Sequence, residues 1–338
     1  MPRRALAALL LVLAWAGTAA PADDPTRLPG QPNDAAAAAY EKGERLNAAG
    51  KFDEAAQAFD EAARRAPLFT AAHHAAGNAL AQAGKAREAE KRYRAAVAVD
   101  PRFVPSWNAL GVVLLTSGRN EDALEAFDEA LRVDPSHVLA RLHRAEARIA
   151  LGRGADAEAD ARELLRRDAA NADARVVLGS AVAAQGRNDE ALGIVDALLA
   201  EQPRHGAALL LRASLLLVAG KLGDAAECAA AALERAGDQP GVRKQVATLT
   251  VRLADAARRA RDSAAEQRAL ETLVVLIPKS AAAHARLGAV IYRRWVARKE
   301  SEREAAELDR ARTEVERAIE LDPEVPGAKE LLELIRSR

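Results

Sequence analysis

Residues 106–135 read SWNALGVVLLTSGRNEDALEAFDEALRVDP, and this stretch decides the fold. An apolar run ends at Gly118, and a second run with apolar residues at helical spacing ends at Asp134-Pro135. Glycine tolerates the left-handed backbone conformation that ends a helix, whereas proline cannot continue one. The stretch therefore predicts two helices joined by a tight turn at Gly118.

The same turn signal recurs along the chain. Glycines stand 34 residues apart at Gly50, Gly84, Gly118, Gly152, Gly186 and Gly220. An alanine follows each of them by five residues, at Ala55, Ala89, Ala123, Ala157, Ala191 and Ala225. A fixed period of this size is typical of repeat proteins, in which each unit is incomplete alone and buries its open face against the next. We therefore expect stacked helix pairs whose ends need caps.

The composition agrees with a helical repeat and excludes some partners. Half of the 338 residues are apolar but only 3% are aromatic, so strands are not expected. Forty-nine basic residues balance forty-nine acidic ones, which leaves no net field to attract nucleic acid. The one cysteine, Cys228, excludes a disulfide within the chain. Without a basic neighbour in the sequence, Cys228 is expected to be a small buried residue and not a reactive thiol.

The third unit resembles the tetratricopeptide repeat, whose first helix carries Trp, Leu-Gly and a large apolar residue and whose second carries Ala, an aromatic and Ala before a Pro. The matching residues are Trp107, Leu110, Gly111, Leu114, Ala123, Phe127, Ala130 and Pro135. The first unit matches through Gly43, Leu46, Ala55, Phe59, Ala62 and Pro67, and the second through Gly77, Leu80, Ala89, Tyr93, Ala96 and Pro101. The resemblance, to family members of the bacterial exported type, implies an all-α, right-handed superhelical solenoid of antiparallel helix pairs.

The pattern also predicts how the chain divides. Residues 36–237 are expected to form six 34-residue repeats, in which small residues let paired helices approach and aromatic residues wedge between units. Repeats four to six carry Ala161, Val195 and Ala229 at the wedge position, and the sixth repeat ends at Gly237 in place of a proline. Residues 238–338 are expected to form two divergent long helix pairs and a C-terminal capping helix.

Within that last part, the seventh pair lacks the glycine turn, and the eighth has roughly eleven residues inserted at its turn. The capping helix is expected to lie within residues 326–338. Its apolar residues Leu331, Leu332, Leu334 and Ile335 are expected on one side, as a cap requires.

The N-terminus reads as a secretory signal peptide over residues 1–22. Arg3 and Arg4 precede an apolar run that is followed by small residues, with cleavage expected near Ala20 to Ala22. The alternative is an uncleaved anchor, but the run is shorter than the roughly 20 apolar residues that a spanning helix needs. The protein is therefore expected to be exported, periplasmic or secreted, without stable membrane insertion after cleavage, and residues 23–35 to be a flexible linker.

No motif for catalysis is present. The chain has no Gly-rich phosphate loop, nucleophile elbow or zinc-protease helix motif, so we expect no enzymatic activity, no cofactor and no small-molecule substrate. The adjacent His73 and His74 point about 100° apart on a helix. His137 and His143 lack a same-face helical spacing, so no metal site is expected. Trp295, within a mixed-charge run, is a candidate contact anchor.

In the family that the chain resembles, the first helices of successive units line the concave face, and partner peptides usually lie there. Carried over by position, the candidates of the front half are Tyr40, Glu44, His74, Asn78, Asn108 and Val112. Those of units four to six are Leu142, His143, Glu146, Val176, Val177, Ser180, Leu210, Leu211, Ser214 and Leu217. The groove is expected to become apolar along its length and to bind a hydrophobic or amphipathic segment there.

Two features favour the alternative that these apolar residues are core or a self-association surface. Arg141, Arg144 and Arg148 take positions that the family makes apolar. In this alternative the first helix of the fourth unit is rotated and Leu142 is core. Residues 209–218, LLLRASLLLV, are apolar nearly all round, as a buried helix is.

The sequence therefore predicts a scaffold that binds a protein or peptide. In the leading interpretation, an adaptor of the cell envelope or periplasm holds a partner segment in the groove. The alternatives are a structural subunit of a larger envelope or secretion complex, contacted through its convex face or ends, and a helper that presents a substrate to a periplasmic enzyme. Recognition by the family's carboxylate clamp is not expected, since Asn78 and Asn108 have no Lys or Arg beside them at groove positions.

Overall fold

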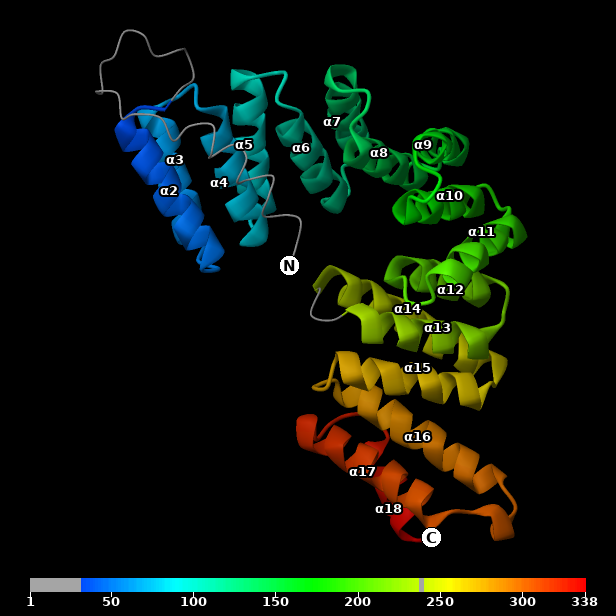
Figure 1. Ribbon diagram of the computed structural model, residues 1–338. Coiled ribbons are helices and arrows are strands. Elements are labelled where there is room, and N and C mark those ends of the chain that lie inside the picture. The colour runs from blue at the N-terminus through cyan, green and yellow to red at the C-terminus, as the bar shows by residue number, and fades with distance from the viewer. Residues whose placement is uncertain (1–31, 237–239) are drawn as a thin grey trace. The chain divides into compact units, whose positions relative to one another are not determined.

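The computed structural model describes residues 32–236 and 240–338, and every regular element in these ranges is a helix. Among residues 32–152, and likewise among residues 153–338, helices that follow one another along the chain pack against each other (Figure 1). The predicted signal peptide, residues 1–22, most of the predicted linker, residues 23–35, and Gly237 lie outside the described residues. The all-α repeat of helix pairs that the sequence predicts is confirmed.

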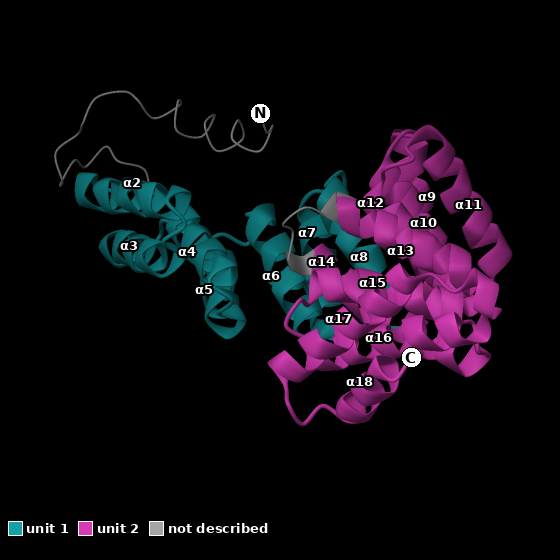
Figure 2. Cartoon of the chain, turned by 90° about the horizontal axis from the view of Figure 1, so that it is seen from below, with its two compact units in different colours: residues 1–152 teal, residues 153–338 magenta. Residues whose placement is uncertain are grey.

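The chain forms two compact units, residues 1–152 and 153–338 (Figure 2). Unit 1 contains α2 (Asp34–Ala48), α3 (Phe52–Arg65), α4 (Thr70–Gln82), α5 (Ala86–Val99), α6 (Val104–Thr116), α7 (Asn120–Val133) and α8 (Val138–Ala150). Unit 2 contains α9 (Gly154–Arg167), α10 (Ala172–Ala184), α11 (Asn188–Glu201), α12 (Gly206–Val218), α13 (Leu222–Ala236), α14 (Pro240–Ala260), α15 (Ser263–Leu276), α16 (Ala281–Ala297), η1 (Glu300–Glu302), α17 (Ala305–Leu321) and α18 (Ala328–Arg336).

The turns inside the helix pairs follow from the repeated glycines. All six glycines of the 34-residue series have positive φ angles, between 72° and 79°. At Gly118, for example, the N–H of Arg119 reaches back to the carbonyl of Leu114 at 2.9 Å, which closes the first helix. A side chain at this φ costs energy, so the glycine is what permits so short a connection.

The seventh pair makes the same turn without a glycine. Arg261 takes a φ of 58°, and the N–H of Asp262 donates to the carbonyl of Ala257 at 2.9 Å, as Arg119 does to Leu114. The expected loss of the turn glycine is therefore confirmed, but the turn itself is kept.

Each helix pair of the first three repeats packs through a glycine on the first helix and an aromatic ring on the second. A Cβ atom added to Gly77 would lie 2.6 Å from Cε1 of Tyr93, and one added to Gly43 would lie 2.6 Å from the Phe59 ring. Gly111 meets the Phe127 ring in the same way. The three rings are buried, and each contacts the glycine of its own helix pair. Phe127 also lies against the His143 ring of the next repeat, with centroids 5.7 Å apart, as a wedge between repeats requires.

We expect Gly111→Ala to destabilise the protein by roughly 1–3 kcal/mol, because the added methyl group overpacks the Phe127 contact. Gly193→Ala is the matched control, since Gly193 lies within α11 and a Cβ there would meet nothing within 4 Å. It should stabilise by up to about 1 kcal/mol through helix propensity alone. Denaturant unfolding of both variants measures the difference, and equal effects would contradict the packing argument.

The eighth pair repeats this contact across an insertion. A Cβ on Gly288 would lie 2.5 Å from Cγ2 of Val315. Gly111 and Phe127 are 16 residues apart whereas Gly288 and Val315 are 27 apart, so the insertion is eleven residues long, as predicted. It is taken up by the end of α16, by η1 and by the start of α17.

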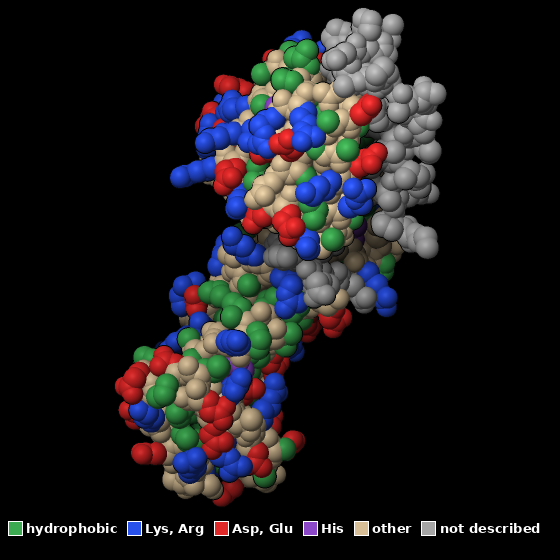
Figure 3. All heavy atoms as spheres, turned by 90° about the vertical axis from the view of Figure 1, so that its left-hand side faces the viewer, with side chains coloured by type: hydrophobic (Ala, Val, Ile, Leu, Met, Phe, Trp, Pro, Cys, Tyr) green, Lys and Arg blue, Asp and Glu red, His purple; other side chains and the backbone are tan. Residues whose placement is uncertain are grey.

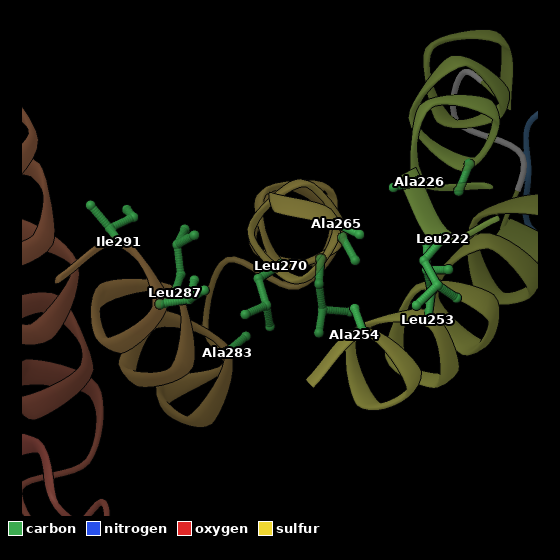
Figure 4. Close-up of a cluster of buried hydrophobic side chains, with 14 of the residues drawn as sticks. Leu222, Ala226, Leu253, Ala254, Ala265, Leu270, Ala283, Leu287 and Ile291 are labelled. Atoms are coloured by element: carbon green, nitrogen blue, oxygen red, sulfur yellow. The ribbon is translucent and has the colours of Figure 1, made fainter. Parts of the chain in front are cut away.

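The core of unit 2 runs through its successive helices. Leu222 of α13, Leu253 of α14, Leu270 of α15 and Leu287 of α16 belong to one buried cluster (Figure 4). Leu270 follows Arg261 by nine residues, as Phe127 follows Gly118, so a leucine replaces the aromatic wedge in the seventh pair. The register of the repeat therefore continues beyond the point where the glycine spacing stops.

The capping helix α18 buries a narrower face than the sequence predicts. Ile335 is buried, and Leu331 and Leu332 pack against the same cluster. Leu334, however, is 46% exposed, so its assignment to the covered side is wrong. Successive residues on a helix turn by about 100°, which carries Leu334 away from the face that Leu331 and Ile335 share.

Candidate functional site

The first helices of the repeats form one surface within each unit, called here the first-helix face. In unit 1 it is made by α2, α4, α6 and α8, and in unit 2 by α10, α12, α14 and α16. Within each unit several neighbouring first helices touch directly, as α4 touches α6 and α10 touches α12. All candidate groove residues lie on these helices.

A polar network crosses the face of unit 1 from α5 to α6. The hydroxyl of Tyr93 donates to Oδ1 of Asn78 at 2.8 Å, and Nδ2 of Asn78 lies 3.1 Å from Nε2 of His74. Nδ1 of His74 lies 3.0 Å from the hydroxyl oxygen of Ser106. Because an amide nitrogen can only donate, Nε2 of His74 accepts and Nδ1 carries the proton. His74 is therefore neutral in this network.

The surroundings of His74 keep its charged form unfavourable. Its ring contacts those of Tyr93 and Phe103, with centroids 5.7 Å and 5.4 Å away. Burial lowers the pKa of His74 from 6.5 to about 4. His74 and Asn78 lie on the first-helix face, as the repeat pattern predicts. The pattern does not reveal their hydrogen bonds to Ser106 and Tyr93, which a partner would otherwise use.

The lowered pKa makes stability depend on pH. Between pH 6.5 and about 4 the unfolded chain binds a proton at His74 that the folded chain does not, so stability falls as the pH falls through this window. We expect wild type to lose up to roughly 3 kcal/mol more than His74→Gln between pH 7 and pH 4. Denaturant unfolding across this range tests it, and equal losses in the two proteins would contradict it.

The other polar candidates of unit 1 are also engaged with the protein itself. Oδ1 of Asn108 lies 3.0 Å from Nδ1 of His143, which joins α6 to α8. Burial lowers the pKa of His143, with a smaller contribution from His137. The groove candidates Asn78 and Asn108 are thus both paired within unit 1.

At the start of unit 1, Tyr40 packs on Phe59 and Phe69, with ring centroids 5.1 Å away in each case. Burial, followed by the nearby charge of Glu44, raises the pKa of Tyr40 to about 12. Burial and Glu41 raise the pKa of Glu44. Tyr40, Glu44 and the α6 residue Val112 are half-buried, so each still offers some surface on this face.

Two apolar candidates lie in the core. Leu142 and Val177 are each 6% exposed, so almost no surface of either side chain is open to a partner. For Leu142 this agrees with the alternative of a rotated helix. On the same helix, Arg144 is half-buried and pairs with Asp128 of α7 at 2.7 Å. Glu146, on the same helix, is exposed.

The remaining candidates of unit 2 stay partly open. Four aliphatic residues are half-buried: Val176, Leu210, Leu211 and Leu217. Val176 and Leu211 pack at the edge of the α10–α12 core. Leu210 and Leu217 pack at the edge of the larger cluster that contains Leu222 and Leu253. Ser180 is half-buried as well, and the hydroxyl of Ser214 donates to the carbonyl of Leu210 at 2.9 Å. This leaves an aliphatic row on α10 and α12, defined by Val176, Leu210, Leu211 and Leu217.

Two expectations outside the groove change. Cys228 is buried as expected, but Nη1 of Arg212 lies 3.0 Å from its sulfur, so it does have a basic neighbour in space. Trp295 is 8% exposed, its indole N–H donates to the carbonyl of Glu304 at 3.1 Å, and Arg303 lies 4.9 Å over its ring. Trp295 therefore holds the inserted segment in place and is not an exposed anchor.

Other kinds of site find little support in the described ranges. No group of three or more His, Cys, Asp or Glu side chains there could hold a metal ion. None of the helices seen in these ranges is long and apolar enough to cross a membrane. On the face that Figure 3 shows, Lys and Arg side chains are interspersed with Asp and Glu.

Comparison with known proteins identifies the repeat. The family profile described as tetratricopeptide repeat matches residues 74–138, 108–172, 142–198 and 177–240. No curated protein sequence matches the chain.

Two solved structures with TM-scores above 0.5 share the fold of this chain. A tetratricopeptide repeat protein from Parabacteroides merdae is 18% identical over 90% of this chain and 100% of its own, with a TM-score of 0.53. A chain of the APC/C hetero-tetramer is 16% identical over 87% of this chain and 54% of its own, with a TM-score of 0.52. A thermophilic repeat protein of Thermus thermophilus is 26% identical over 54% of this chain and 100% of its own, with a TM-score of 0.43.

Proposed function

The chain belongs to the tetratricopeptide-repeat family, whose fold is in general a scaffold for protein–protein interaction, and we propose that its first-helix face binds an apolar or amphipathic segment of a partner protein. The aliphatic row on α10 and α12 carries this proposal. The fold is typically a module without enzymatic activity, and the partner is a protein or peptide.

The row supports the proposal because it stays open after the unit has packed. Val176 and Leu211 lie beside the α10–α12 core, and Leu210 and Leu217 lie beside the larger cluster, yet all four keep accessible surface. Burying such aliphatic surface stabilises a complex by about 25 cal/mol for each Å² removed from water. An amphipathic helix or an extended apolar segment would supply the complementary side chains.

The face of unit 1 would contribute differently. Its polar groups, His74, Asn78 and Asn108, already bond to one another or to Ser106, Tyr93 and His143. A partner that displaced these bonds would have to replace them, because an unpaired buried polar group costs about 1–3 kcal/mol. We therefore assign affinity chiefly to the aliphatic row of unit 2.

Capture of the partner tests this assignment. The chain without its leader, carrying Leu211→Glu or Leu217→Glu, should retain less than about a tenth of the partner that wild type captures from cell-envelope extract, since each change buries a charge in the contact. Val275→Glu is the matched control: Val275 is 64% exposed on the second helix α15, away from the row. This variant should capture the partner as wild type does.

Melting temperatures separate binding from folding in this experiment. If Leu211→Glu and Leu217→Glu melt like wild type and still capture the partner, the aliphatic row is not the binding surface. Contact through second helices or chain ends would then explain the capture, as in a structural subunit of a larger complex.

The location of this interaction is part of the proposal. The basic start, apolar run and small residues of positions 1–22 support export to the periplasm or the cell surface. We expect the protein isolated from cells to begin near residues 21–23 and to partition with the periplasmic or secreted fraction. Mass spectrometry of its N-terminal peptide checks this, and a chain that begins at Met1 in the cytoplasm would contradict it.

A further inference from the structure

A second feature of unit 2 is a pocket of about 360 Å³ beside the start of α18. The end of α14, the start of α15, one side of α16 and the turn that begins α18 all line it. The residues that matter below are Arg258, Glu266, Arg286, Ala289, Arg293 and Leu331. A volume of this size accommodates one or two side chains and not a folded domain.

Glu266 is what sets the seventh repeat apart. It follows the turn residue Arg261 by five positions, as Ala123 follows Gly118, so it takes the place of the small alanine that the other repeats have. It is nevertheless only 3% exposed. A buried carboxylate is costly unless it is paired, and the arginines of the pocket provide the pairing. Nη2 of Arg293 donates to Oε2 of Glu266 at 2.6 Å, and Nη2 of Arg286 lies 4.0 Å from Oε1.

Some guanidinium N–H donors of the pocket remain unpaired after these contacts are made. Arg286 binds Asp255 through Nη1 at 2.9 Å, but its Nε and Nη2 atoms are buried and have no hydrogen-bond partner. The side chain of Arg258 has no hydrogen bond or ion pair within the described part of the chain. Three arginines thus face two carboxylates, Glu266 and Asp255, with guanidinium donors left over.

Guanidinium N–H groups without a partner are suited to bind an oxyanion, because they are charged hydrogen-bond donors. The buried Nε and Nη2 of Arg286 form the edge of the guanidinium fork, and two parallel N–H donors on such a fork match the two oxygens of a carboxylate. The uncharged lining, which includes Ala289 and Leu331, gives the pocket an apolar wall next to these donors. The combination suits a carboxylate attached to an apolar neighbour, as in a peptide, better than a fully hydrated free anion.

The pocket also belongs to the first-helix face. Aligning Leu287-Gly288 with Leu110-Gly111 puts Ala285 at the position of Asn108 and Ala289 at that of Val112. Both alanines line the pocket. Small residues at these positions leave open the space that larger side chains fill in the third repeat.

We propose that this pocket binds an acidic residue of the partner segment, with its carboxylate on Arg286 and Arg258 and an apolar neighbour against Ala289 and Leu331. This inference rests on the proposed function and gives it a sequence preference: an acidic residue accompanies the apolar residues that the aliphatic row takes. The pair between Arg293 and Glu266 holds the wall of the pocket and leaves Arg286 to the ligand.

The test uses the full mature chain and blocked tripeptides. The probes are acetyl-Leu-Glu-Leu-amide and its glutamine counterpart, and the readout is the ¹⁵N–¹H signal of the Arg286 Nε–H group. The glutamate peptide should shift this signal to saturation, with binding that weakens as salt is raised. The glutamine peptide should bind about tenfold more weakly or worse, because the charge-assisted hydrogen bonds are lost. Equal binding of the two peptides overturns the proposal.

Two neighbouring arginines of α14 provide matched variants. Arg258→Gln removes a donor from the pocket and should raise the dissociation constant of the glutamate peptide roughly fivefold to tenfold. Arg259→Gln removes a neighbouring exposed arginine that does not line the pocket and should change the constant by less than about twofold. If the two variants behave alike, general electrostatic attraction explains the binding and the pocket is not the site.

The source of the carboxylate is settled by two more probes. Acetyl-Leu-Gln-Leu with a free C-terminus tests whether a terminal carboxylate serves as well as a side chain, and its binding supports the same site. Glutarate at the same concentration tests for a small-anion site, and binding as tight as that of the glutamate peptide overturns the peptide assignment. Failure of this pocket is distinguishable from failure of the proposed function, because partner capture that depends on Leu211 but not on Arg258 would reject the pocket alone.

Discussion

The contact between a glycine on each first helix and a ring on its partner helix is the constraint on which the front of this protein depends. Gly77 and Tyr93 show it most plainly, since no Cβ atom fits between them. The contact brings two helices together closely enough to place the polar edge of the ring, the hydroxyl of Tyr93, beside Asn78. The hydrogen-bond network of the first-helix face therefore depends on the same helix packing that buries the ring.

Where the aromatic ring of this contact is replaced, the side chains on the first-helix face differ as well. Repeats four to six have Ala161, Val195 and Ala229 at the wedge position, and all three are buried. On the first helices of the fifth and sixth repeats, Val176, Leu210, Leu211 and Leu217 then keep accessible aliphatic surface beside Ser180 and Ser214. In the seventh repeat the alanine position carries Glu266, and the arginines around it make the pocket beside α18 charged.

The candidate site shows how much a residue's position within a repeat predicts about its surroundings. The repeat pattern placed His74, Asn108 and Leu211 on the correct helices, because helical periodicity fixes which face a residue takes. It did not show that Asn78 bonds to Tyr93 and His74, or that Leu142 and Val177 are buried. Those outcomes depend on how each helix is rotated against its neighbours, and residues one position apart differ in direction by about 100°.

The sequence by itself determined the helix pairs, their turns and the eleven-residue insertion, because glycine, proline and small residues act locally on the backbone and recur at a fixed spacing. Only the tertiary structure decided which polar groups are free. Arg293 and Glu266 lie 27 residues apart and His74 and Ser106 lie 32 apart, and no local rule links them. Their pairing follows from the stacking of successive repeats, which brings side chains of neighbouring units within hydrogen-bond distance and leaves a few of them unpaired.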